Sequence, residues 1–332
     1  RVPGTAALLL GRKFRVYGPP GADHLGSYCT RVLGADAPLR LAMQLGGRVR
    51  ANRKPVVALL DAAGRTVGYA KLGVSPLARS LVRNERAALR TLADAGFPEL
   101  RLPRLLHGGV WSGHELVVQS ALPVTAPAVP DDARRVRAMC QLARGCGVQR
   151  SRLTDAPYWT ALRARARRTG ALRTGALGTG ALQTGDRRLA EAVALVDHDA
   201  HGSYLEYGAW HGDWTPWNSH PVADAVLLWD WERFATGVPL GYDALHHRLA
   251  ELLQRDAPGA LAVLFGEAVT LLAPFGPAPF GLSPAQARTT TALFAIELAT
   301  RYLGDGQQTT TARAVIDALL PTLTAQLGGE ST

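Results

Sequence analysis

Cysteine is scarce in this chain, and long apolar runs are missing. Its 332 residues include three cysteines, Cys29, Cys140 and Cys146, and no C-x-x-C pair. This small, odd number predicts a reduced, cytoplasmic setting and no structural zinc site. No segment reaches the roughly 20 apolar residues of a membrane span. The apolar residues 6–10 are too short for a signal sequence, and they lead into a basic pair at positions 12 and 13. We therefore expect no membrane partner.

Lysine is nearly absent as well, although the chain is basic. It has three lysines, Lys13, Lys54 and Lys71, against 34 arginines, and its formal net charge is +10. Residues 1–120 carry a net +11, residues 121–188 a net +9 and residues 189–332 a net −10. A basic first half attracts a polyanion such as a nucleotide. We find no helix-turn-helix, zinc-finger or RNA-binding aromatic pattern, and therefore expect no nucleic-acid partner.

Two short motifs lie close together in the second half of the chain. An H-G-D triplet ends at Asp213, and Asn218 follows five positions later in a loop broken by Gly and Pro. Asp230 opens a D-W-E triplet directly after the apolar run at residues 225–229, which reads as a strand. Phosphoryl transfer needs one carboxylate to orient the acceptor hydroxyl, and amide and carboxylate oxygens to hold Mg²⁺. Asp213, Asn218 and Asp230 suit these roles in that order. Ordinary loop and turn residues are the alternative.

A basic strand residue and an acidic helix residue precede these motifs. Residues 66–72 alternate as a strand does and follow the run at 56–60 across a Gly-containing turn, which predicts a hairpin carrying Lys71. Glu85 lies in residues 80–92, whose apolar spacing predicts a helix. A lysine held by an acid is the group that binds nucleotide phosphates in kinases. A solvated strand-end lysine and a surface helix charge are the alternatives.

Together these motifs resemble those of the aminoglycoside phosphotransferase (kinase-like, APH) superfamily, over roughly residues 41–235. The H-G-D-x-x-x-x-N loop resembles that family's catalytic loop, and D-W-E its counterpart of D-F-G. The resemblance implies that Asp213 is the catalytic base and that Asn218 and Asp230 are metal ligands. It further implies a set of nucleotide-binding residues: Lys71, Glu85, Gly46, Gly47, Gln119 and Ala121. The loop at Gly46 and Gly47 departs from the G-x-G-x-x-G pattern, and an ordinary hairpin loop is the alternative there.

The resemblance also implies a fold and an activity. We expect an α+β, two-lobed protein-kinase-like fold, with a small mixed α/β N-lobe at residues 1–120 and a mostly helical C-lobe at 121–332. The implied activity moves the γ-phosphoryl group of ATP or GTP, with Mg²⁺, to a hydroxyl of a small molecule. Aminoglycoside-like compounds, sugars and amino alcohols are candidate acceptors, and the acidic residues 189–332 favour acceptors that carry amines. The alternative is a kinase-like subunit that binds or phosphorylates a peptide or protein partner.

The C-terminal two thirds of the chain read as helices. Apolar periodicity predicts helices at 133–142, 158–168, 186–196, 242–253, 258–272, 284–302 and 309–327. Between two of these lie three Ala-Leu-x-Thr-Gly copies, which we interpret as a flexible insertion at about residues 169–185, since three copies are too few for a solenoid. Five of the seven tryptophans cluster around the two motifs. Trp214 and Trp217 are either core residues or a stacking platform for a ligand.

Overall fold

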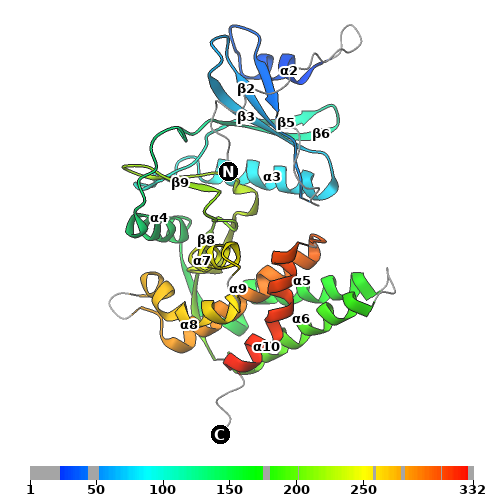
Figure 1. The fold of residues 1–332 in the computed structure, drawn as a ribbon, viewed down its shortest axis with the longest axis vertical. Coiled ribbons are helices and arrows are strands. Elements are labelled where there is room, and N and C mark those ends of the chain that lie inside the picture. Colours follow the sequence, from blue (N-terminus) through cyan, green and yellow to red (C-terminus); the bar gives the residue numbers. More distant parts are fainter. Residues whose placement is uncertain are drawn as a thin grey trace. The chain divides into compact units, whose positions relative to one another are not determined.

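The computed structural model describes residues 23–43, 52–174, 180–200, 202–256, 259–277, 281–307 and 309–327. The chain divides into two compact units, residues 1–131 with 217–234, and residues 132–216 with 235–332. The first is rich in strands and the second in helices, as the ribbon in Figure 1 shows. This division differs from the single boundary expected at residue 120. The segment 217–234 returns to the first unit because its strand pairs there.

The main sheet of the first unit is antiparallel throughout. Its strands, in spatial order, are β1 (Arg40–Met43), β2 (Val56–Leu60), β3 (Thr66–Gly73), β6 (His114–Ser120) and β5 (Leu105–Trp111). The predicted hairpin is confirmed: β2 and β3 pair with Ala58 opposite Tyr69. Gly64 turns the chain between them with φ 82°, a conformation that glycine adopts without steric cost.

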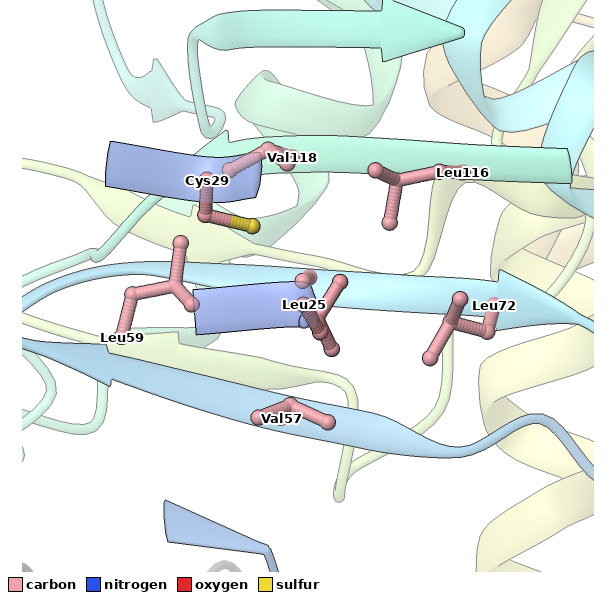
Figure 2. Packing of buried hydrophobic residues seen from close by; sticks show 8 residues of the cluster. Leu25, Cys29, Val57, Leu59, Leu72, Leu116 and Val118 are labelled. Atoms are coloured by element: carbon pink, nitrogen blue, oxygen red, sulfur yellow. The ribbon is translucent and has the colours of Figure 1, made fainter. Parts of the chain in front are cut away.

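Helices cover both faces of this sheet. Alternate strand residues share one face, so Val57, Leu59, Leu72, Leu116 and Val118 form one apolar cluster. Leu25 and Cys29 lie one turn apart on α2 (Leu25–Val32) and complete that cluster, as Figure 2 shows. The opposite face packs against α3 (Pro76–Thr91), which begins where the Ser75 hydroxyl accepts a hydrogen bond from the Ala78 amide. Strand residues that alternate with those of the α2 cluster therefore point towards α3.

A second, smaller sheet belongs to the same unit. It consists of β4 (Leu100–Arg101), β10 (Val226–Leu228) and β9 (Ser219–Pro221), in that order. β10 runs parallel to β4 and antiparallel to β9. The 3-10 turn η2 (Trp231–Arg233) follows β10 and packs against α3. Residues distant in sequence thus meet beside α3.

The second unit is mainly helical, around one small sheet. Strands β11 (Ala235–Pro239), β8 (Tyr204–Trp210) and β7 (Gln149–Arg152) form the sheet in that order. The helices are α4 (Asp132–Gly145), α5 (Pro157–Thr174), α6 (Gly180–Asp199), α7 (Tyr242–Gln254), α8 (Ala260–Leu272), α9 (Pro284–Gly304) and α10 (Thr310–Leu327), with 3-10 turns η1 (Leu153–Asp155) and η3 (Ala273–Phe275). Helix α9 contacts α5, α6, α7, α8 and α10 (Figure 1). It is therefore the central helix of this unit.

Both ends of the repeat tract, which was expected to be a flexible insertion, are helical. Helix α5 continues to Thr174 and α6 begins at Gly180, so much of the expected flexible segment is helical. Alanine and leucine are strong helix formers, and they outweigh the roughly 1 kcal/mol cost of an occasional glycine. Residues 175–179 lie outside the described residues, as do Gly46 and Gly47. In the described ranges, no helix is long and apolar enough to cross a membrane.

Candidate functional site

A buried group of charges lies between the main sheet and α3 in the first unit. Ala70 and Leu72 are buried on the strand around Lys71, and Leu72 points to the α2 side, so Lys71 points the other way, towards α3. Its Nζ lies 2.6 Å from Glu85 Oε1 and also donates to Asp230. Lys71 is 3% exposed and Glu85 is fully buried. The structure thus brings together three of the residues that the sequence singled out.

The charges of this group depend on one another. Burial alone opposes the charge of Lys71, but the carboxylates of Asp230 and Glu85 outweigh it, so the pKa of Lys71 rises. A lysine without these partners would be costly to bury in its charged form. Lys71 is therefore a fixed cation between two carboxylates. The side chain of one of these, Asp230, is 36% exposed.

A second lysine joins the same group, and its sequence context alone indicated no role. Lys54 forms an ion pair with Glu232, and both side chains are less than a tenth exposed. Burial lowers the pKa of Lys54, and the charge of Lys71 acts in the same direction while Asp230 opposes it. Asn84, beside Glu85 on α3, donates to the carbonyl oxygens of Glu232 at 2.6 Å and Phe234 at 3.2 Å. Helix α3 therefore holds both the lysine and the segment after Asp230.

Strand pairing places Asn218 beside the D-W-E motif. In the β9–β10 pair Ser219 lies opposite Leu228, and the Trp229 amide donates to the Asn218 carbonyl at 3.1 Å. Asn218 is 5% exposed. Asp230 itself has φ 67°, a left-handed conformation uncommon outside glycine and concentrated at functional sites. An amide and a carboxylate are therefore adjacent in one unit, and both are oxygen donors of the kind that Mg²⁺ prefers.

The expected adenine-binding segment lies at the end of β6. Gln119 is 4% exposed, pairs in the sheet with Tyr69, and its buried side-chain oxygen has no hydrogen-bond partner within the described ranges. Ala121 directly follows the strand and is half-buried. An unsatisfied buried oxygen is costly and marks a position to explain. Gly46 and Gly47, expected to cover the phosphates, lie outside the described residues.

The loop that carries Asp213 belongs to the second unit, where two helices hold its backbone. Asp243, on the first turn of α7, accepts hydrogen bonds from the His211 amide at 2.7 Å and the Gly212 amide at 3.1 Å. The Asp213 amide donates in turn to His211 Nδ1 at 3.2 Å. Burial raises the pKa of Asp243 to about 7, although the two amides and Arg301 act against that rise. The Asp243 carboxyl is thus the clamp of the loop.

Two further residues contact this loop. Arg301, in the last turn of α9, donates to the Gly212 carbonyl at 2.5 Å and to His246 Nε2 at 3.1 Å. His246 Nε2 lies 3.7 Å from Asp213 Oδ1. Burial and the Arg301 charge lower the pKa of His246 to about 3, so this approach joins a neutral ring to a carboxylate. The neighbouring His247 is also buried, which lowers its pKa to about 4.

Sequence reasoning missed Asp243, His246, Arg301, Lys54 and Asn84 as site residues. The scarcity of lysine was a usable signal for Lys54, since two of the three lysines lie in the charge group. For Asp243 and Arg301 no local pattern exists, because their partners are 31 and 89 positions away in the chain.

Of the two interpretations of Trp214 and Trp217, core packing is the one that holds for Trp214. Trp214 is fully buried in the second unit and cannot stack on a ligand. Trp217 is 48% exposed and keeps that option.

Comparison with solved structures identifies the fold. A thermostable mutant of aminoglycoside phosphotransferase APH(4)-Ia, in complex with ADP and hygromycin B, matches with a TM-score of 0.57 and 13% identity, over 93% of this chain and 99% of that one. The chain has the fold of the aminoglycoside phosphotransferases. Its α+β kinase-like class, predicted from the motifs, is confirmed. No protein-family model matches the chain, and no curated protein does.

Two further solved structures share this kinase-like fold. Spectinomycin phosphotransferase APH(9)-Ia, in complex with ADP and spectinomycin, has a TM-score of 0.52 and 10% identity, over 93% of this chain and 99% of that one. A protein assigned as a fructosamine-3-kinase, from Haemophilus somnus 129PT, has a TM-score of 0.52 and 12% identity, over 90% of this chain and 96% of that one. At such identities the likeness establishes the fold.

Proposed function

We propose that this protein transfers the γ-phosphoryl group of ATP or GTP to a hydroxyl of a small molecule. The observation that carries the proposal is the buried group in which Lys71 contacts both Glu85 and Asp230. A fold needs no such arrangement for stability, since an apolar core of the same volume is usually as stable or more so. A fixed cation beside a partly exposed carboxylate suits a phosphate chain and its metal.

Each of the site residues predicted from the sequence has a role in this proposal. Lys71 binds the nucleotide phosphates and Glu85 holds it in place. Asp230 and Asn218 bind Mg²⁺, which neutralises charge that develops on the phosphates. Asp213 orients the acceptor hydroxyl and accepts its proton. Gln119 and Ala121 receive the base of the nucleotide, since Gln119 carries a buried oxygen to be satisfied.

The phosphate-covering loop remains part of the proposal through Gly46 and Gly47. We add Lys54 to it, because this lysine lies between that loop and β2 in sequence and its pKa is already lowered by burial. A phosphate would give Lys54 an anionic partner other than Glu232. The basic balance of the first unit, 19 Lys and Arg against 11 Asp and Glu, supports a polyanionic ligand.

The solved structures of this fold support a nucleotide and a small hydroxylated acceptor. Their ligands include ADP with hygromycin B, AMP-PNP with hygromycin B, and ADP with spectinomycin. The APH(4)-Ia enzyme was also studied as two alanine variants, one of an aspartate and one of an asparagine five positions later. Asp213 and Asn218 have the same spacing here.

The net charge of the second unit gives no reason to prefer one class of acceptor. The expectation of an amine-bearing acceptor rested on residues 189–332, which carry 6 Arg and 16 acidic residues. The second unit as it folds holds 18 Arg and 16 acidic residues, a net +2, because it gains residues 132–188 and loses 217–234. The proposed acceptors therefore remain aminoglycoside-like compounds, sugars and amino alcohols alike.

We retain a cytoplasmic location in the proposal, since the three cysteines are free.

A screen of acceptors tests the proposal. The protein is incubated with Mg²⁺ and terminally labelled ATP or GTP, against panels of aminoglycosides, sugars, amino alcohols and hydroxylated peptides. We expect label in a small-molecule product with the wild type and none with Lys71→Met. Label in peptides alone would favour the peptide-kinase alternative. Nucleotide binding without transfer to any panel would contradict the proposed activity.

A further inference from the structure

Gly212 is held from two helices at once, through its amide and through its carbonyl group. The Gly212 amide donates to Asp243 on α7, and the Gly212 carbonyl accepts from Arg301 on α9. Gly212 has φ 83°, a conformation that a residue with a Cβ adopts only with strain. The backbone immediately before Asp213 therefore has little freedom, and its direction depends on contacts from far along the chain.

Arg301 also fixes the protonation state of the His246 ring, which lies next to Asp213. Its Nη2 donates to His246 Nε2 at 3.1 Å, so this ring nitrogen is an acceptor and carries no proton. His246 is 5% exposed. Because Nε2 is also the atom 3.7 Å from Asp213 Oδ1, it has no proton to give to that carboxylate. The neutral imidazole thus lies between the guanidinium of Arg301 and the carboxylate of Asp213.

This arrangement matters for a general base. A charged partner in direct contact with a carboxylate stabilises its ionised form and weakens it as a base. An arginine that donates to the loop backbone can instead position the carboxylate through the main chain. We propose that Arg301 is a positioning residue for Asp213, acting through the Gly212 carbonyl and through His246 as a neutral spacer. The inference rests on the proposed phosphotransfer, in which Asp213 is the base.

Arg301 has a second effect, on the Asp243 clamp. The groups that face Asp243 are the amides of His211 and Gly212, the Asp213 carboxylate and the Arg301 guanidinium. The amides and Arg301 favour the ionised form of Asp243, whereas burial and Asp213 oppose it. Loss of the Arg301 charge raises the pKa of Asp243 above its value of about 7. At neutral pH the clamp then binds a proton and its hold on the two amides weakens.

Three variants separate these effects. Arg301→Gln keeps a donor but removes the charge. Arg301→Lys keeps the charge but loses the planar fork that reaches Gly212 and His246 together. Arg313→Gln, on the exposed side of α10, is the matched control. For each we measure transfer to the acceptor from pH 5.5 to about 9, and amide hydrogen exchange at His211 and Gly212 over the same range, corrected for the intrinsic pH dependence of exchange.

We expect Arg301→Gln to lower kcat about 10- to 100-fold, the size of losing hydrogen bonds from a charged group, with little change in the KM for nucleotide. In Arg301→Gln the acid limb of the kcat/KM profile moves to higher pH. The pH below which the His211 and Gly212 amides lose protection rises as well. Arg301→Lys restores the position of the acid limb while loop exchange stays faster than in the wild type. Arg313→Gln behaves as the wild type.

Unchanged exchange and an unchanged acid limb in Arg301→Gln would overturn the inference. A reduced kcat in Arg301→Gln with the wild-type acid limb would reduce Arg301 to a packing residue. The exchange measurement needs no acceptor, so it tests Arg301 even if the wild type transfers no phosphate. In that case the proposed function fails on the wild type alone, and the exchange result still decides whether Arg301 holds the loop.

Discussion

Asp243 gives the sharpest pH-dependent prediction. This carboxyl is 4% exposed and its pKa is about 7 in the fold, against 3.8 for the free group. A folded-state pKa above the unfolded value means that the protonated form stabilises the fold. That contribution is complete below about pH 4 and is lost as the pH rises through 7. A shift of about three units corresponds to ~4 kcal/mol, at 1.36 kcal/mol per unit, as an order of magnitude.

The perturbation is Asp243→Asn, which cannot ionise. One buried amide then lacks an acceptor, which costs about 1–3 kcal/mol at every pH. Below about pH 4 we therefore expect the variant to be less stable than the wild type. As the pH rises towards 8 the wild type loses its pH-dependent contribution, so the difference shrinks and then reverses. The variant should nevertheless be less active, because a neutral side chain holds the His211 and Gly212 amides less firmly.

Urea unfolding followed by tryptophan fluorescence, from about pH 3.5 to about 8.5, measures this difference. Asp199→Asn, at an exposed position on α6, is the control and should track the wild type at each pH. A stability difference between Asp243→Asn and the wild type that does not change with pH would refute the reasoning. It would mean that Asp243 is ionised, or protonated, throughout this range.

Three other predictions rest on the contacts described. Lys71→Met should lower the free energy of unfolding by about 3–5 kcal/mol, since it leaves two carboxylates without their cation, whereas Arg65→Met in an exposed ion pair should change little in urea unfolding. Asp230→Ala should abolish the thermal stabilisation that Mg²⁺ adds to ATP, and an unchanged shift would exclude this residue as a metal ligand. Ser283→Ala should cost about 1 kcal/mol by removing the capping box of α9, measured by urea unfolding.

Much of the first unit was predictable because its signals are local. The apolar run at residues 56–60, the turn after it and the alternation at 66–72 predicted β2 and β3 as a hairpin that carries Lys71. The apolar face at 80–92 gave α3 and the position of Glu85. Since alternate strand residues point to opposite faces, the pairing of Lys71 with an acidic residue of α3 needed only the sheet and the helix.

The remaining features depend on contacts between distant segments. Residues 217–234 were assigned to the C-lobe because they follow it in sequence, yet β10 pairs with β4 more than 120 residues earlier. Asp243 and Arg301 reach the loop that carries Asp213 only after α7 and α9 have packed. The helical ends of the repeat tract were missed for another reason: Thr-Gly steps indicate turns locally, but the Ala-Leu pairs beside them favour helix.

The central claim is that Asp213 acts as the base in phosphoryl transfer. Phosphorus NMR of a mixture containing the protein, MgATP and the best acceptor from the screen tests it most directly. We predict a phosphate-ester resonance that grows with the wild type, and about 10²- to 10⁴-fold more slowly with Asp213→Asn, the usual loss for a general base. Binding of MgATP should be unchanged in that variant. An ester resonance growing equally fast in both proteins, or free phosphate as the only product, would contradict the account.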